Sequence, residues 1–302
     1  MKAAVLTGYG DVDQLVIRDM PDPVAGRNAV VVRVAAAGIN PIDWKMRSGA
    51  AKGRFPLQFP AILGRDAAGE VAAIGDGVTA FKVGDKVLGL VNGAYAELVA
   101  APVESWAALP AGLDVTDAGA LPLVLLTGAQ LMEHAVDPSE GATVLVTGAV
   151  GSVGRVAVHA AKLRGARVWA GVRGSQREEA TRLAADGVVV LDDPASIAGA
   201  PIFDAIADTV NGDTIRKLYD KVAPAGTIGS VLGEPADAKE RGFTVRAFMA
   251  QPDSTMLARY ALEVAKGKLA IPIAARLPLA QVREAQALAE QNRPGGKVVL
   301  IP

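Results

Sequence analysis

Hydrophobic and polar positions follow two different patterns along the 302-residue chain, and the change comes near residue 115. Before it, short β-branched runs alternate with turn residues, which predicts a mostly β region. After it, short apolar runs alternate with longer segments of helical period, which predicts βαβ units around a parallel sheet. The expected strands of the first part are residues 2–6, 29–36, 69–74, 86–90 and 94–100.

The second part carries its own set of expected elements. After Pro252, two helical segments and a terminal strand follow, and this strand should return the chain to the first region. We therefore expect one domain of residues 1–114, completed by residues 254–302, and a second domain of residues 115–253. The expected strands are 143–147, 167–171, 187–190, 203–208, 226–231, 244–248 and 297–301, with helices at 154–163, 177–185, 255–266 and 279–291.

Composition narrows the classes of protein. Hydrophobic residues make up 51% of the chain, enough for a large core. The net charge is −1, and the chain has no block of like charges, which argues against nucleic acid or a membrane surface as partner. The longest apolar stretch, residues 118–129, contains Pro122 and is shorter than the roughly 20 residues a bilayer requires. No export signal is recognisable, so a cytoplasmic location is expected.

A glycine-rich turn is the clearest chemical motif. The apolar run VLVT at residues 144–147 is followed directly by GAVGSVG at residues 148–154. Gly151 lets the backbone approach a pyrophosphate, Gly154 lets helix and strand pack closely, and the helix N-terminus offers free N–H groups. An ordinary strand-to-helix connection is the alternative. The expected dinucleotide-binding residues are Ala149, Val150, Gly151, Ser152, Val153 and Gly154.

The residues after the next strand indicate which dinucleotide binds. An acidic side chain about 20 positions beyond the turn would hold the ribose of NAD. Glycine stands there instead, and two arginines and a serine follow, which would suit the 2′-phosphate of NADPH. A solvated loop of mixed charge is the alternative, because Glu178 and Glu179 are adjacent. The residues in question are Gly171, Val172, Arg173, Ser175 and Arg177.

Seven ordered sequence blocks extend over nearly the whole chain. They are VRVAAAGINPIDWKMRSG, FPAILGRDAAGEVAAIG, FKVGDKVLG, GAYAEL, VLVTGAVGSVG, FDAIADTVNGDT and GGKVVL. Together they resemble the medium-chain dehydrogenase/reductase superfamily and, within it, the zinc-free quinone oxidoreductase branch. The resemblance implies an α/β protein with a GroES-like β-barrel catalytic domain and a Rossmann doubly wound parallel-sheet domain that binds NADPH.

The same resemblance locates the positions at which zinc-dependent relatives bind their metal. Those relatives carry a cysteine near Asn40, a His-Glu pair near Arg65 and Asp66, and a further ligand near Leu123. The chain has no cysteine, and its two histidines, at 134 and 159, lie far from these positions in the sequence. No metal is therefore expected, and the implied reaction is hydride transfer from NADPH to an already electrophilic acceptor, a quinone or an α,β-unsaturated carbonyl.

Three residues of the first part are candidates for this chemistry. Asn40 should donate its amide to substrate or cofactor, unless it only caps a turn. Lys45 stands where relatives carry tyrosine or histidine and could donate to a developing enolate, or else be an ordinary surface lysine. Asp43 is expected to hold Arg65 or the loop in place.

The resemblance adds residues near the nicotinamide. Thr127 matches a family threonine, with a plain helix N-cap as the alternative. Five turn and strand-end residues of the second part match family segments beside the nicotinamide, and a place in the core is their alternative. They are Val231, Leu232, Gly233, Phe248 and Met249.

Two functions remain open from the sequence. One is an NADPH-dependent quinone or enone reductase, and the other is an NADPH-binding structural or regulatory protein with little turnover. A homodimer is expected, because the strand at residues 244–248 would be an exposed sheet edge. The acceptor pocket would be made by loops such as residues 49–58 and 92–93, whose shape the sequence does not define.

Overall fold

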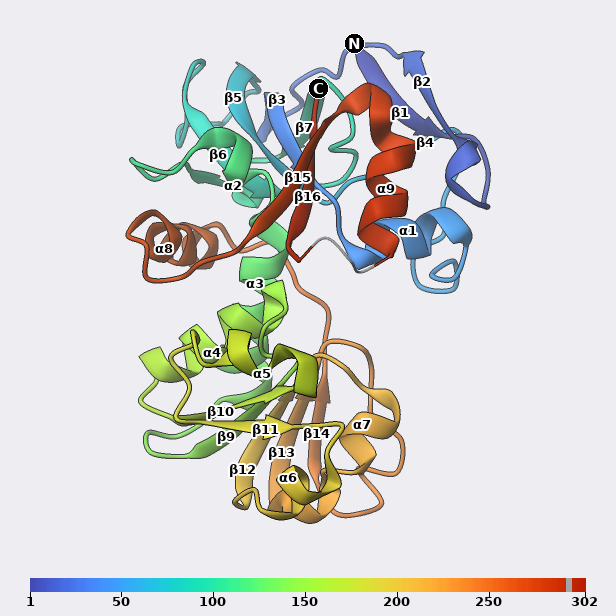
Figure 1. Ribbon diagram of the computed structural model, residues 1–302. Helices are drawn as coiled ribbons and strands as arrows, with labels where there is room; N and C mark the ends of the chain where they lie inside the picture. The colour runs from blue at the N-terminus through green and yellow to red at the C-terminus, as the bar shows by residue number, and fades with distance from the viewer. Residues whose placement is uncertain (292–294) are drawn as a thin grey trace. The chain divides into compact units, whose positions relative to one another are not determined.

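The computed structural model describes residues 1–291 and 295–302 (Figure 1). It contains two compact units: Met1–Leu123 together with Gln251–Pro302, and Val124–Ala250. The first boundary lies later than residue 114 because helix α2 (Val115–Ala118) packs on strands of the first unit. The return lies slightly before residue 254, at Gln251.

The first unit is built mainly from antiparallel strands. One sheet has the strand order β2-β1-β4, and the larger sheet has the order β15-β16-β3-β5-β6-β8, with β7 also paired to β3. The strands are β1 (Lys2–Leu6), β2 (Leu15–Asp19), β3 (Ala29–Gly38), β4 (Ala61–Ile62), β5 (Asp66–Ile74), β6 (Lys86–Leu90), β7 (Leu98–Pro102), β8 (Trp106–Ala108), β15 (Ile273–Pro278) and β16 (Lys297–Ile301).

The C-terminal strand packs back on the N-terminal β region, as expected. Strand β16 pairs antiparallel with β3, where Val299 lies opposite Gly38. Buried Val, Leu and Ala side chains from both ends of the chain share one core. The helices of this unit are α1 (Pro41–Ser48), α2, α8 (Ser254–Ala265) and α9 (Val282–Glu290).

Three expected strands of this unit have other bounds in the structure. The strand predicted at residues 29–36 continues to Gly38, and the strand predicted at residues 69–74 begins at Asp66. The strand predicted at residues 94–100 begins only at Leu98, because the backbone bends where the buried Tyr95 ring packs against Gly64. Gly64 has φ +101 and a Cβ there would lie 2.5 Å from the Tyr95 ring, so the contact requires glycine.

The second unit is a six-stranded parallel sheet with the strand order β11-β10-β9-β12-β13-β14. The order reverses between β9 and β12, which is where doubly wound folds bind their ligands. The predicted helix at residues 177–185 ends early, at Ala180. The elements are α3 (Pro122–Gln130), β9 (Thr143–Thr147), α4 (Ser152–Leu163), β10 (Arg167–Val172), α5 (Arg177–Ala180), β11 (Gly187–Val190), α6 (Pro194–Ala198), β12 (Phe203–Asp208), α7 (Gly212–Arg216), β13 (Val222–Ser230) and β14 (Thr244–Ala247).

Strand register aligns the carboxyl ends of this sheet. Thr147 lies opposite Gly171, and Ser230 lies opposite both Asp208 and Ala247. The segments after these strands therefore gather at one edge. Within the described parts of the chain, no helix is long and apolar enough to cross a membrane.

Candidate functional site

A buried polar cluster lies in the first unit at the start of helix α1. Pro41 begins the helix, where its missing N–H costs nothing, and Asn40 precedes it in an extended conformation. Asn40 is 1% exposed. Asn40 stands at the N-cap position of α1, and its side chain donates from Nδ2 to Asp66 Oδ2 at 2.7 Å.

Asp66 lies at the centre of this cluster and is fully buried. Its Oδ1 accepts the Leu123 backbone N–H at 2.6 Å, while Oδ2 accepts from Asn40. Gly38 leaves the space for this carboxylate, because a Cβ there would lie 2.9 Å from Asp66 Oδ2. Asp66 thus links Asn40 and Leu123, the positions near which the resemblance expects the metal ligands of zinc-dependent relatives.

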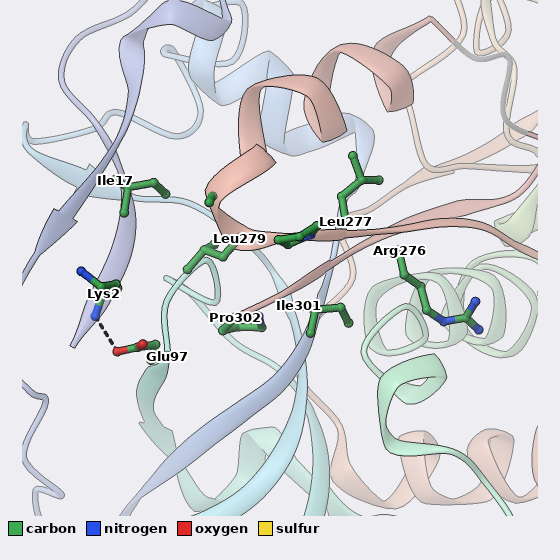
Figure 2. A pocket seen from close by; sticks show the side chains of 10 residues that line it. Lys2, Ile17, Glu97, Arg276, Leu277, Leu279, Ile301 and Pro302 are labelled. Carbon is green, nitrogen blue, oxygen red and sulfur yellow. Dashed lines mark hydrogen bonds between the residues drawn. The ribbon is translucent and has the colours of Figure 1, made fainter.

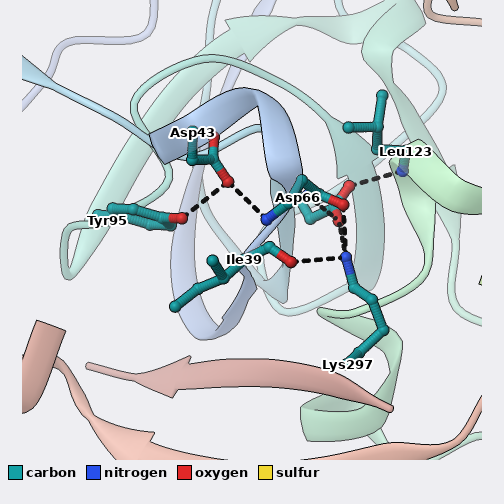
Figure 3. Close-up of polar contacts among 7 residues, drawn as sticks. Ile39, Asp43, Asp66, Tyr95, Leu123 and Lys297 are labelled. Atoms are coloured by element: carbon teal, nitrogen blue, oxygen red, sulfur yellow. Dashed lines mark hydrogen bonds and ion pairs between the residues drawn. The ribbon is translucent and has the colours of Figure 1, made fainter. Parts of the chain in front are cut away.

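Lys297 supplies the cation of the cluster, and sequence reasoning missed it. Its side chain is 7% exposed. The ammonium Nζ donates to the Ile39 carbonyl at 2.9 Å and to Asn40 Oδ1, and lies 3.4 Å from Asp66 Oδ2 (Figure 3). The lysine that begins the otherwise apolar strand KVVLI was the available clue.

Asp43 is buried on the other side of Asn40. Its Oδ2 accepts the Asn40 backbone N–H and the Tyr95 hydroxyl, each at 2.8 Å. Burial raises the pKa of Asp43 to about 6, although these two hydrogen bonds oppose the rise. Burial and the Asp43 charge raise the pKa of Tyr95 well above 10. Asp43 thus holds Tyr95 and the Asn40 turn, which is the loop of the expectation; its hydrogen bonds among the described residues do not include Arg65.

Lys45 differs from these residues because its side chain is exposed on α1. The structure therefore brings Asn40 and Asp43 together with Asp66, Tyr95 and Lys297, and leaves Lys45 at the surface.

The residues of this cluster do not fit a zinc ion. Asn40 and Leu123 offer an amide and an alkyl side chain, and Asp66 is already paired with an ammonium. In the described residues, no group of three or more His, Cys, Asp or Glu side chains could hold a metal. A dication and the Lys297 ammonium at one place would repel each other.

The glycine-rich turn of the second unit has the geometry of a phosphate cradle. Gly148 adopts φ +64, so Ala149 needs no positive φ. A Cβ at Gly154 would lie 2.2 Å from Gly148 O, which shows how closely helix and turn pack. Gly151 is exposed, and no side chain caps α4. The first backbone N–H groups of the helix, at Ser152 and Val153, therefore have no side-chain partner and could bind an anion.

Arg155 contacts both this turn and Glu179, which lies beside the next loop. Its Nε donates to the Val150 carbonyl at 2.9 Å, and its guanidinium pairs with Glu179. Glu178 pairs with Arg182 at 3.3 Å. The acids beside the loop are therefore engaged by other arginines.

Arg173, Ser175 and Arg177 follow buried Gly171 and Val172, and all three side chains are exposed. Within the described ranges, neither Arg173 nor Arg177 has an ion-pair partner. A Cβ at Gly171 would lie 3.1 Å from Val146 O, so this position has little room for a side chain.

Asp208 is a third buried carboxylate, after Asp43 and Asp66, and the sequence did not suggest it. It ends β12, and its Oδ1 accepts the Thr147 hydroxyl at 2.8 Å and the Val210 and Asn211 amides. Its Oδ2 accepts the Ser230 hydroxyl at 3.0 Å. Asp208 thus joins the ends of β9, β12 and β13 at the reversal of strand order.

The remaining predicted cofactor residues lie on or near this edge. Val231, Leu232 and Gly233 follow β13, and Phe248 and Met249 follow β14. Gly233 has φ +102, and Leu232 and Met249 are largely exposed. Thr127 lies in the middle of α3, so it is not the helix N-cap.

A surface pocket of about 550 Å³ in the first unit involves none of these residues (Figure 2). Leu277, Leu279 and Ile301 form apolar walls, while the Lys2 backbone N–H donates to Glu97 at 2.6 Å. Arg276 is paired with Asp117. These polar groups of the pocket are thus already paired with other residues.

Known proteins are similar to this chain in sequence and in fold. The Alcohol dehydrogenase GroES-like domain family matches residues 26–111, and the Zinc-binding dehydrogenase family matches residues 183–300. A probable quinone oxidoreductase from Schizosaccharomyces pombe is 32% identical over 246 residues, covering 80% of this chain and 69% of the relative. The chain belongs to the medium-chain dehydrogenase/reductase superfamily, in its quinone oxidoreductase branch. The predicted family and fold are confirmed.

Solved structures similar to this chain have names that point to different nicotinamide cofactors. An NAD-dependent alcohol dehydrogenase superposes with a TM-score of 0.88 at 28% identity, covering 100% of both chains. A mycobacterial protein complexed with NADPH superposes with a TM-score of 0.84 at 27% identity, again covering 100% of both chains. This medium-chain dehydrogenase/reductase is therefore an oxidoreductase of a nicotinamide-binding superfamily, and the fold alone does not choose between NAD and NADP.

Proposed function

We propose that this oxidoreductase uses NADPH to reduce a quinone or an α,β-unsaturated carbonyl without zinc. The observation that carries the proposal is the edge of the parallel sheet at residues 171–177. Gly171 replaces the acid that would hold the ribose of NAD, and Arg173 and Arg177 have no carboxylate partner in the described chain. The mixed-charge alternative is weakened because Glu178 and Glu179 pair with Arg182 and Arg155.

The residues present fit the proposed cofactor in two places. Gly151, Gly154 and the first amides of α4 would hold the pyrophosphate, and Arg173 with Ser175 would hold the 2′-phosphate. Asp192 accepts the Gly174 amide at 2.8 Å, so the arginine side chain and not this amide would contact that phosphate. The solved mycobacterial complex with NADPH is consistent with this assignment.

The chemistry follows from what the chain's own residues can do. When bound, NADPH supplies a hydride. Asn40 would orient the acceptor through its amide, and Lys45 would donate a proton from the exposed face of α1. Asn40 and Asp66 hold the Lys297 ammonium, and Leu123 offers only an alkyl side chain, so these residues would supply no Lewis acid and the acceptor would already be electrophilic, as quinones and enones are.

Steady-state oxidation of NADPH and NADH across a panel of quinones and enones tests the function. We expect turnover with NADPH and a dissociation constant for NADPH at least about 10-fold below that for NADH, since one charge-assisted hydrogen bond is lost without the 2′-phosphate. Arg173→Ala should abolish this preference. Arg182→Ala, an exposed arginine already paired with Glu178, is the matched control and should keep it.

Two results would contradict the proposal. Tighter binding of NADH, or an unchanged preference in Arg173→Ala, would remove the NADPH assignment. Tight NADPH binding with no oxidation on any acceptor would favour the alternative, a cofactor-binding protein with little turnover.

We also propose a homodimer formed by pairing of strand β14, which lies at the open edge of the six-stranded sheet. Light scattering of the purified protein should give twice the 30.9 kDa chain mass. A monomer at assay concentration would contradict it.

A further inference from the structure

The ammonium of Lys297 has a complete set of partners inside the first unit. An ammonium has three N–H donors and no acceptor. Lys297 faces three acceptors, namely the Ile39 carbonyl at 2.9 Å, Asn40 Oδ1, and Asp66 Oδ2 at 3.4 Å. Burial lowers the pKa of Lys297, whereas the Asp66 carboxylate raises it. The arrangement suits the charged form, because a neutral amine would present a lone pair to an all-acceptor cage.

The same contacts determine how the Asn40 amide is oriented. An ammonium can only donate and a carboxylate can only accept, so Oδ1 must face Lys297 and Nδ2 must face Asp66. One Nδ2 hydrogen is donated to Asp66. Among the described residues no acceptor is assigned to the other hydrogen, so this N–H is a buried donor without a protein partner.

We propose that Lys297 is a positioning residue, a fixed cation that replaces a metal between Asn40 and Asp66 and strengthens the free Asn40 N–H as a donor to the acceptor oxygen. A cation on the amide oxygen draws electron density from the nitrogen and so polarises its N–H bonds. Lys297 itself does not touch the substrate. The inference rests on the proposed function, through the role of Asn40.

The effect is directed at the transition state. The acceptor oxygen gains negative charge as the hydride arrives, and a pre-oriented, polarised donor stabilises that charge more than it stabilises the neutral ground state. Loss of the cation should therefore lower kcat and leave KM for the acceptor and the dissociation constant of NADPH unchanged. A merely structural lysine would not produce this split.

The absence of cysteine from the chain allows a charge-only test. In Lys297→Cys the new thiol is unique, and its alkylation in denaturant with 2-bromoethylamine, followed by refolding, gives a side chain of lysine's length with an ammonium. Alkylation with 1-bromopropane gives the matched neutral side chain. We expect the aminoethyl protein to approach wild-type kcat and the propyl protein to fall at least about 10-fold below it. Equal kcat for the two adducts would overturn the proposal.

If either adduct fails to refold, a second variant still tests the proposal. Lys297→Met combined with Asp66→Asn removes both buried charges together, so neither is left unpaired. We expect this double variant to fold, to bind NADPH as the wild type does, and to lose at least about 10-fold in kcat. An unchanged kcat would contradict the role of Lys297.

A spectroscopic readout separates this inference from the proposed function. In ¹⁵N-labelled protein, the Asn40 Nδ2 protons should resonate further downfield with the ammonium present than in the propyl adduct or the double variant. Identical Asn40 shifts would overturn the polarisation even if the enzyme is active. A wild-type protein that reduces no quinone or enone but shows the shift would refute only the proposed function.

Discussion

Asp43 is a buried carboxyl whose protonation should control how the stability of the first unit depends on pH. Its pKa is about 6 in the folded protein, against an ordinary value of 3.8. The folded state therefore binds this proton more tightly than the unfolded state. The stabilising contribution is complete below about pH 4 and is lost as pH rises through 6. A difference of about two pKa units corresponds to about 3 kcal/mol.

Asp43→Asn removes this dependence with little change of shape. Asparagine keeps an oxygen that can accept from the Asn40 amide and the Tyr95 hydroxyl. Its amino group takes the place of Asp43 Oδ1, which has no hydrogen-bond partner. Asp66 raises and Lys297 lowers the pKa of Asp43, and both remain in the variant.

The assay is urea unfolding from pH 4 to pH 8, followed by tryptophan fluorescence. Trp44 and Trp106 report on the unit that contains Asp43. The unfolding free energy of the wild type, taken relative to Asp43→Asn, should fall by about 3 kcal/mol between pH 4 and pH 7. A flat or rising difference over that range would refute the reasoning, and carboxyl ¹³C NMR would check the pKa directly.

Asp114→Asn is the contrasting control. Hydrogen bonds from Thr116 lower the pKa of Asp114, so its stabilising contribution is present above the ordinary value of 3.8 and is lost as pH falls through the lowered value. The difference between wild type and Asp114→Asn should therefore be constant from pH 5 to pH 8 and change only in stronger acid.

The remaining predictions concern other parts of the site. Gly154→Ala places a Cβ 2.2 Å from Gly148 O and should cost about 1–3 kcal/mol of stability and weaken NADPH binding, measured by unfolding and fluorescence titration. Asp208→Ala leaves two hydroxyls and two amides without their acceptor and should lower the unfolding free energy by about 3 kcal/mol. Asp204→Ala loses only the hydrogen bond from the Thr143 amide and should lower it by about 1 kcal/mol. Equal losses would contradict the conclusion that Asp208 joins the three strand ends. Lys45→Met should lower kcat on enones about 10-fold with unchanged NADPH affinity, and an unchanged kcat would remove Lys45 from the mechanism.

The carboxyl edge of the parallel sheet was largely predictable from local sequence. A run such as VLVT followed by GAVGSVG requires a strand, a turn and a helix in that order, because period and glycine positions act over a few residues. Parallel pairing then brings the ends of β9, β10, β12, β13 and β14 to one edge. The terminal strand was likewise predictable, since KVVLI is an apolar run of strand length.

The polar cluster of the first unit depended on the tertiary structure. Asn40 and Asp66 are 26 positions apart, and Lys297 is a further 231 from Asp66. No periodic pattern encodes which buried ammonium meets which carboxylate. That pairing arises only when β16 closes against β3, because burial then forces each charge to find a partner. The sequence by itself determined the family and the parallel sheet, and the folded chain decided that the Lys297 ammonium lies between Asn40 and Asp66, which are far from it in the sequence.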